Sequence, residues 1–207
     1  PRNIVCYARV FMAAFDVVGV GLNATDTLIL VPRFPAYAGK EPFEREILSP
    51  GGQVATAMVA LSRWGVKTKY IGKVGGDELG HFSLNSIRQE GVDVSSVTME
   101  PDVPNQFAMI IVDSVSGERT ILWNRDERLM YGEGELRKEE VCSGKILHLD
   151  GHDTHAALQC ARWAKEEGIP TIIDLDKVEP PTSKLIKEIG FVITSSRFPT
   201  LFTRISD

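Results

Sequence analysis

Short apolar runs alternate with amphipathic runs along most of the chain, and this alternation limits the possible folds more than any other feature. Each apolar run has the length of one strand, and each amphipathic run repeats its apolar residues at helical spacing. Strands that alternate with helices are typical of a parallel sheet with helices on its faces. The apolar runs predict strands at Phe15–Val20, Lys69–Val74, Lys145–Leu149, Thr171–Leu175 and Phe191–Thr194, with a further extended run at Thr27–Val31.

The amphipathic runs predict helices between these strands, and no helix is expected after the last strand. These helices cover Gln53–Trp64, Glu78–Glu90, Thr154–Glu167 and Ser183–Ile189, and a glycine follows each of the first three. Two further strands, at Phe107–Asp113 and Thr120–Asn124, are joined by a turn that contains Ser116-Gly117. This hairpin does not fit a parallel sheet, so we expect it to project from the sheet.

Composition excludes several classes of protein. The chain has 207 residues, 43% of them hydrophobic, which predicts one large or two small folded domains rather than a disordered chain. The net charge of −5 argues against a nucleic-acid-binding protein, and no apolar run has the length of a membrane span. Cys6, Cys142 and Cys160 are an odd number without a Cys-x-x-Cys pair, which argues against a disulfide framework and predicts a reducing, cytoplasmic location.

Both ends of the sequence are unusual for a complete fold. The first methionine is Met12, directly before the first strand, so we interpret residues 1–11 as upstream or cloning-derived sequence and residues 12–207 as the domain. The other end stops soon after the last predicted strand, which indicates that the C-terminal part of the fold is missing.

Polar residues follow the first strand, where ligands bind in open α/β sheets. Asn23 and Asp26 come after Gly19-Val20-Gly21, and their amide and carboxylate oxygens suit the hydroxyl groups of a polyol. The alternative is that both side chains only satisfy the backbone of a turn. A dinucleotide site is disfavoured, because an extended run follows where the phosphate-binding helix should begin.

Two later segments carry further candidates. Pro50-Gly51-Gly52-Gln53 places a glycine pair before a helix, where backbone N–H groups suit an oxygen-rich ligand, although a tight turn alone would explain it. The segment His148–His155 contains three histidines and two aspartates, but its side chains lie on a strand and on a helix, so we predict no metal site there. Asp150 ends a strand and is expected at the same edge as Asp26, while Asp153 or Thr154 is expected to cap the next helix.

Taken in order, these segments resemble the ribokinase-like (PfkB) carbohydrate kinase family from about Phe15 to Thr203. The resemblance rests on Gly21-Leu22-Asn23-Ala24-Thr25-Asp26, Pro50-Gly51-Gly52, Lys73-Val74-Gly75-Gly76-Asp77-Glu78-Leu79-Gly80, Gly91-Val92-Asp93-Val94, Leu147-His148-Leu149-Asp150-Gly151 and Ile169-Pro170. It implies a Rossmann-like α/β domain with a small projecting β-sheet lid from about residues 28–48 and 106–124.

The resemblance also implies a function. Family members phosphorylate a hydroxyl group, often of a sugar, with ATP and Mg²⁺. By position, the substrate-binding residues would be Asn23, Asp26, Gly51, Gly52, Gln53, Thr56, Arg125 and Asp150, with Arg125 placed as in kinases of sugar acids. The alternative for Arg125 is a solvated charge at the end of a hairpin. A homodimer through the lid is a further implication.

Three departures from the family pattern limit the expected activity. Thr56 replaces the usual asparagine, and Ser196 and Pro199 replace the Asn-x-x-Glu motif that organises metal and phosphate. The Gly-Ala-Gly-Asp segment, which supplies the anion hole and the general base, is absent. We therefore expect the substrate-binding and lid portion of an ATP-dependent carbohydrate kinase, inactive alone, with no ATP or Mg²⁺ held by this chain. The alternative is a non-catalytic sugar-binding fragment.

Overall fold

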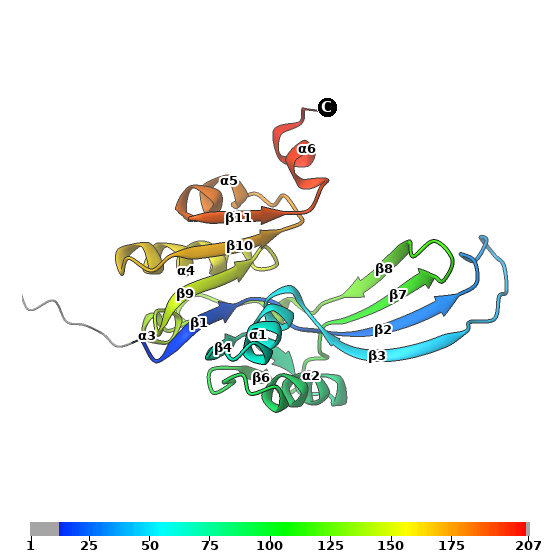
Figure 1. The fold of residues 1–207 in the computed structure, drawn as a ribbon, viewed down its shortest axis with the longest axis horizontal. Helices are drawn as coiled ribbons and strands as arrows, with labels where there is room; N and C mark the ends of the chain where they lie inside the picture. Colours follow the sequence, from blue (N-terminus) through cyan, green and yellow to red (C-terminus); the bar gives the residue numbers. More distant parts are fainter. Residues whose placement is uncertain (1–12, 206–207) are drawn as a thin grey trace, which may run out of the picture.

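The computed structural model describes residues 13–205, and the predicted segment 1–11 and Met12 lie outside the described residues. The central sheet has five parallel strands in the order β11-β10-β9-β1-β4 (Figure 1). They are β1 (Phe15–Val20), β4 (Thr68–Ile71), β9 (Gly144–Asp150), β10 (Thr171–Leu175) and β11 (Phe191–Thr194). The predicted α/β class is confirmed.

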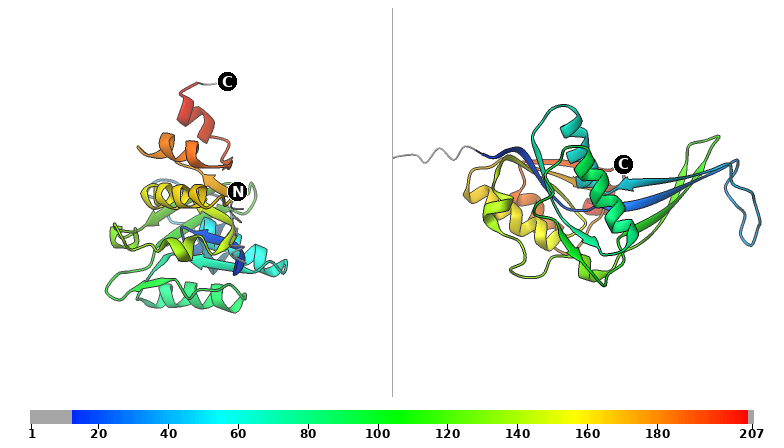
Figure 2. Two further views of the ribbon diagram at one scale, coloured as in Figure 1. Left: turned by 90° about the vertical axis from the view of Figure 1, so that its left-hand side faces the viewer. Right: turned by 90° about the horizontal axis from the view of Figure 1, so that it is seen from below.

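Helices cover both faces of this sheet, because neighbouring residues of each strand point to opposite sides. Val17 packs in one core with Val54 and Met58, whereas Val18 packs in the other with Leu147 and Ala161. The first core includes α1 (Gln53–Arg63) and α2 (Glu78–Gln89). The second includes α3 (Lys138–Val141), α4 (Thr154–Glu166) and α5 (Thr182–Leu185), and a 3₁₀ turn, Ile186–Glu188, follows α5 (Figure 2).

A second sheet projects from the central sheet, and we call it the lid sheet (Figure 1). Its order is β3-β2-β7-β8, with bounds β2 (Ala24–Val31), β3 (Arg45–Gly51), β7 (Phe107–Asp113) and β8 (Arg119–Asn124). The projecting hairpin is therefore confirmed. The first lid segment is longer than the predicted 28–48, because β2 begins at Ala24 and β3 ends at Gly51. A strand, β2, follows β1 where a dinucleotide-binding fold would have its phosphate-binding helix.

The predicted strand Lys69–Val74 is wrong, because the structure divides it at Gly72. β4 ends before this glycine, and β5 (Lys73–Gly75) pairs in parallel with β6 (Thr98–Glu100) in a separate two-stranded sheet. The Tyr70 hydroxyl occupies the space where a Cβ of Gly72 would lie. The chain therefore bends here around a buried ring.

The expectation that no helix follows the last strand is also wrong. α6 (Phe198–Thr203) comes directly after β11, with a proline in its first turn. The rings of Phe198 and Phe202 stack with centroids 5.6 Å apart, and Phe198 is buried in the second core. Six residues are too few for the helical periodicity that revealed the longer helices.

Candidate functional site

The lid sheet and the carboxyl ends of the central strands meet where β1 passes into β2. Asp26 pairs with Ala108 on β7, and Ala108 pairs with Trp123 on β8. Directly paired residues point to the same side of a sheet. Asp26, Ala108 and Trp123 therefore share one face of the lid sheet, which we call the lid face. The Lys177 ammonium group, just beyond β10, lies 4.2 Å from the centre of the Trp123 ring, so the lid face meets the edge of the central sheet.

The Asp26 carboxylate is seated against Gly51. A Cβ on Gly51 would overlap this carboxylate, so only a glycine leaves it room. No hydrogen bond to Asp26 is formed by another described side chain, and burial raises its pKa above the ordinary value. A half-buried carboxylate with free acceptor positions can accept hydrogen bonds from ligand hydroxyl groups. The structure thus brings Asp26 and Gly51 together, as the sequence predicts.

Gly52 brings the helix α1 close to the turn after β1. Its φ of 97° lies in the region that favours glycine, and a Cβ would overlap Leu22 and Asn23 backbone atoms. Gln53, the first residue of α1, donates from Nε2 to Asp174 Oδ2 at 3.0 Å, and its Oε1 is buried without a partner. Thr56 is exposed on α1. The cavity described below is not lined by Thr56, nor by the other predicted residues Asp26, Gly51, Gly52 and Gln53.

Asp150 is buried at the end of β9, and its carboxylate holds backbone in place. Oδ2 accepts from Leu22 N–H at 2.7 Å, and Oδ1 accepts from His152 N–H at 3.0 Å. Burial raises the pKa of Asp150 to about 6, although these two backbone donors favour its charged form. Asp150 therefore fixes the turn that follows β1, which is a positioning role.

The side chain of Asn23, like that of Asp150, is hydrogen-bonded within the protein. Its Nδ2 donates to the Tyr70 hydroxyl at 3.0 Å and to the Lys73 carbonyl at 2.7 Å, and its Oδ1 accepts from Ser83 Oγ at 3.3 Å. Only 3% of Asn23 is exposed. Because its amide is bonded to the protein on every side, Asn23 anchors the turn that carries Asp26.

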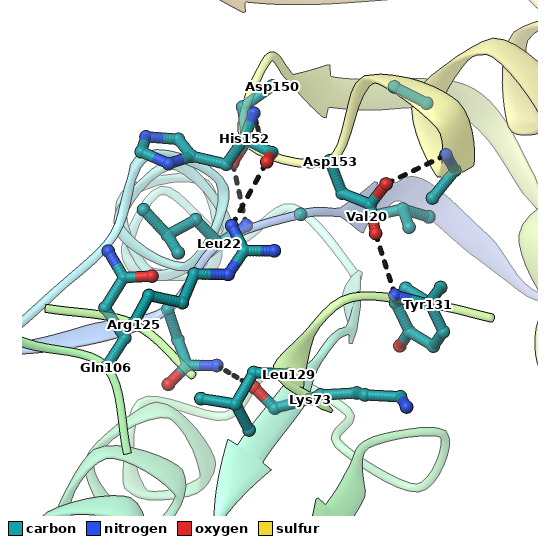
Figure 3. Close-up of a pocket in the computed structure, with 14 residues that line it drawn as sticks. Val20, Leu22, Lys73, Gln106, Arg125, Leu129, Tyr131, Asp150, His152 and Asp153 are labelled. Carbon is teal, nitrogen blue, oxygen red and sulfur yellow. Dashed lines mark hydrogen bonds between the residues drawn. The ribbon is translucent and has the colours of Figure 1, made fainter. Parts of the chain in front are cut away.

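Arg125 follows β8 and reaches a small cavity beside this turn (Figure 3). Its Nη1 donates to the His152 carbonyl at 3.1 Å. Among the described residues, no carboxylate oxygen lies within 4.0 Å of the guanidinium group. Burial lowers the pKa of Arg125, while Asp153 and Asp150 at longer range favour its charge. A largely buried cation without an ion-pair partner is suited to an anionic ligand group.

Several residues that line this cavity were not found from the sequence. Gln106 precedes β7, Leu129 and Tyr131 lie in the segment between β8 and α3, and Ala157 lies on α4. The fold alone brings these three parts of the chain together. The only sequence signal was the polar pair Asn105-Gln106 before an apolar strand. The full lining is Val20, Gly21, Leu22, Asn23, Lys73, Gln106, Arg125, Leu129, Tyr131, Asp150, His152, Asp153, Ala156 and Ala157.

The histidine segment has a structural role in the part of the chain that the structure describes. Asp153 caps α4, since its Oδ1 accepts from Ala156 N–H at 3.1 Å, and its Oδ2 accepts from Tyr131 N–H at 2.8 Å. The predicted cap is confirmed. Burial lowers the pKa of His152 to about 4, so this imidazole is neutral at pH 7. Residues 13–205 contain no group of three or more His, Cys, Asp or Glu side chains that could hold a metal ion.

A parallel sheet, a projecting lid sheet and a polar crevice between them define a ribokinase-like fold. The model of the pfkB family of carbohydrate kinases matches residues 16–190. The chain belongs to the pfkB family of carbohydrate kinases.

Individual relatives agree with this family. The chain is 26% identical over 181 residues to ketohexokinase of Mus musculus, covering 83% of this chain and 59% of that protein. A ribokinase-type crystal structure from Agrobacterium tumefaciens is 27% identical with a TM-score of 0.84, covering 93% of this chain and 63% of that one. A ribokinase of Arabidopsis thaliana complexed with ribose and ATP has a TM-score of 0.75 at 19% identity, covering 92% and 63%, and this likeness concerns the fold alone. The chain spans 31% to 59% of the length of curated relatives that it matches.

Proposed function

We propose that this chain is the substrate-binding and lid portion of an ATP-dependent kinase that phosphorylates a hydroxyl group of a sugar or sugar acid. The observation that carries the proposal is the seat of Asp26 against the bare backbone of Gly51, on the lid face that meets the edge of the central sheet, in a chain of this family. The carboxylate would accept hydrogen bonds from substrate hydroxyl groups and so orient the substrate. Arg125 would attract an anionic substrate group.

ATP and Mg²⁺ belong to the proposal for the intact protein. ATP would supply the phosphoryl group, and Mg²⁺ would neutralise negative charge on the phosphate. The described residues do not provide three convergent metal ligands, so we derive no step through Mg²⁺. The sequence also has no Gly-Ala-Gly-Asp segment to supply an anion hole and a base. That the chain alone is inactive and holds neither group stays a prediction.

The rival proposal is a non-catalytic sugar-binding fragment, and an activity assay separates the two. We would compare the 207-residue chain with the product of the whole open reading frame that encodes it, measuring sugar-dependent release of ADP. The kinase proposal predicts turnover by the whole product and none by the chain. Sugar binding without turnover by either protein would favour the rival, and sugar-dependent turnover by the chain would refute its inactivity.

We also propose that two copies associate through their lid sheets. β8 is exposed along its whole length, and Ile121 and Trp123 on the lid face are 47% and 55% exposed. Exposed apolar patches of this kind favour association. Light scattering should therefore give a dimer that the substitution Ile121→Lys converts to a smaller species.

A cytoplasmic location is the remaining part of the proposal. Cys142 and Cys160 are free thiols, as in proteins of reducing compartments. Within residues 13–205, no helix is long and apolar enough to cross a membrane. Fractionation of cells that express the protein would test the location.

A further inference from the structure

Gln106 is a buried polar residue whose side chain has no partner. Only 5% of the residue is exposed, and its Oε1 is buried without a hydrogen bond. Its amide nitrogen also makes no hydrogen bond to a described residue, whereas its backbone carbonyl accepts from Thr25 N–H at 2.9 Å. The backbone is therefore fixed and the amide is not. An unbonded buried polar group is costly, which indicates that something else occupies the position beside it.

The register of the lid sheet places Gln106 near the substrate groups already described. Gln106 lies two residues before Ala108, and Arg125 lies two residues after Trp123, so both continue the lid face that carries Asp26. Both residues also line the same small cavity, and Figure 3 shows their side chains entering it. Asp26, Gln106 and Arg125 come from three adjacent strands or their ends.

The two cavity residues offer complementary chemistry. The Arg125 guanidinium has N–H donors without a described partner, and no carboxylate neutralises it within 4.0 Å. It suits a ligand carboxylate, which accepts from a guanidinium fork. Gln106 Oε1 is an acceptor, so it needs a donor such as a hydroxyl group. A hydroxyl next to a carboxylate supplies both groups in one small ligand.

We propose that Gln106 determines substrate specificity by accepting a hydrogen bond from the hydroxyl on the carbon next to a carboxylate that Arg125 binds. The proposal rests on the proposed function and narrows its substrate class to hydroxy sugar acids. A site built to bond a hydroxyl discriminates against the analogue that lacks it, because its own polar atom then stays unpaired. A bridging water beside Gln106 is the competing explanation, and it predicts no such discrimination.

The test uses titration calorimetry of the 207-residue chain with two probes, D-gluconate and 2-deoxy-D-gluconate, which differ in the hydroxyl next to the carboxylate. We expect the unchanged chain to bind D-gluconate about 10-fold more tightly than the deoxy compound. Gln106→Met, which has a similar volume, should remove this preference and leave the affinity for the deoxy compound unchanged. Gln89→Met, at the exposed end of α2, is the matched control and should keep the preference.

Each of the remaining outcomes would contradict the inference about Gln106. A preference that persists in Gln106→Met would assign Gln106 to structure or to a bound water. If Gln106→Met lost affinity equally for both probes and had a lowered melting temperature, Gln106 would also be assigned a structural role. In that case Gln106→Asn, which keeps the amide, should restore folding without restoring the preference for D-gluconate. Binding of D-fructose or D-ribose but of neither acid would refute the inference and leave the proposed function intact. Binding of none of the four probes would refute the inference, and the activity assay described above would then decide the proposed function.

Discussion

At the scale of single residues, the site separates side chains that hold the chain from side chains that are free to bind. Asn23 and Asp150 have their polar atoms bonded to the protein, whereas Asp26, Gln106 and Arg125 keep unbonded groups. The sequence identified four of these five residues, all except Gln106. It could not show which of them bind the protein itself and which are free to bind a ligand. Whether an amide points to Tyr70 or to a ligand depends on elements far away in the chain.

Asn23→Ala tests this division. The substitution removes one hydrogen bond each from the Tyr70 hydroxyl, the Lys73 carbonyl and the Ser83 hydroxyl, all within a buried region. The Tyr70 hydroxyl keeps its hydrogen bond to the Gly21 carbonyl. Unsatisfied buried groups cost about 1–3 kcal/mol, so the free energy of unfolding should fall by at least this amount. Urea unfolding monitored by tryptophan fluorescence would measure it. An unchanged midpoint, with sugar affinity lost, would make Asn23 a direct ligand-binding residue instead.

The pKa of Asp26 predicts how binding depends on pH. Burial raises this pKa, and the charged carboxylate is the form that accepts two hydroxyl hydrogen bonds. Substrate affinity should therefore weaken as the pH falls through the raised pKa, at a higher pH than for an exposed aspartate. The Asp26→Asn variant should lack this part of the profile, while the part due to Asp150, with its pKa near 6, stays in both proteins. Identical profiles in both proteins would contradict the assignment.

At the scale of elements, the sequence predicted strands best where a continuous apolar run marks them, on buried strands and on the exposed edge strand Phe191–Thr194. The strand Thr171–Leu175 was predicted with its observed bounds, since its apolar run packs on two sides. The apolar pattern did not reveal β3, because Arg45–Gly51 has no apolar alternation and is held by pairing with β2. Only the family resemblance placed part of the lid there, at about residues 28–48. The division at Gly72 was missed because it depends on the packing of Tyr70.

One buried lysine joins the segment after Arg125 to the sheet. The Lys73 side chain is 4% exposed, and its ammonium group lies 3.0 Å from Glu100 and 2.8 Å from Glu135. Burial alone would lower the pKa of Lys73, but these two carboxylates raise it. Lys73→Met would leave the Glu100 and Glu135 carboxylates without their positive partner. It should therefore lower the free energy of unfolding by about 1–3 kcal/mol.

An exposed ion pair provides the control for Lys73→Met, and the stability of both variants should be measured as a function of pH. Arg137→Met removes an exposed ion pair of 3.4 Å and should change stability by less than about 0.5 kcal/mol. The hydrogen bond from Lys73 lowers the pKa of Glu135, so the stabilisation is present above about pH 4 and is lost as the pH falls through the lowered pKa. Lys73→Met should flatten the acid side of the stability profile, and an unchanged profile would contradict this role.

At the scale of the whole molecule, apolar surface remains exposed on the last strand and helix. Phe191 and Ile193 on β11 are 64% and 57% exposed, and Leu201 on α6 is 57% exposed. β11 is also an edge strand of the central sheet. Open strand edges and apolar patches promote association.

The isolated chain should therefore form larger species in addition to the proposed lid dimer. Ile193→Lys should reduce these larger species, whereas Ile121→Lys should affect the lid dimer instead. Size-exclusion chromatography with light scattering distinguishes the two variants. A monodisperse, cooperatively melting monomer at high concentration would contradict both expectations.

In the proposed function, Asp26 orients a sugar or sugar acid at the lid face, beside Gly51. The most direct measurement is the affinity of the substrate, determined by calorimetry for the unchanged chain, for Asp26→Ala and for the exposed control Asp102→Ala. One hydrogen bond to a charged group contributes about 1.5–3 kcal/mol, so Asp26→Ala should weaken binding by about 10- to 100-fold, with Asp26→Asn milder and Asp102→Ala unchanged. Unchanged affinity in Asp26→Ala, with a lowered melting temperature, would make Asp26 a turn residue and contradict the claim.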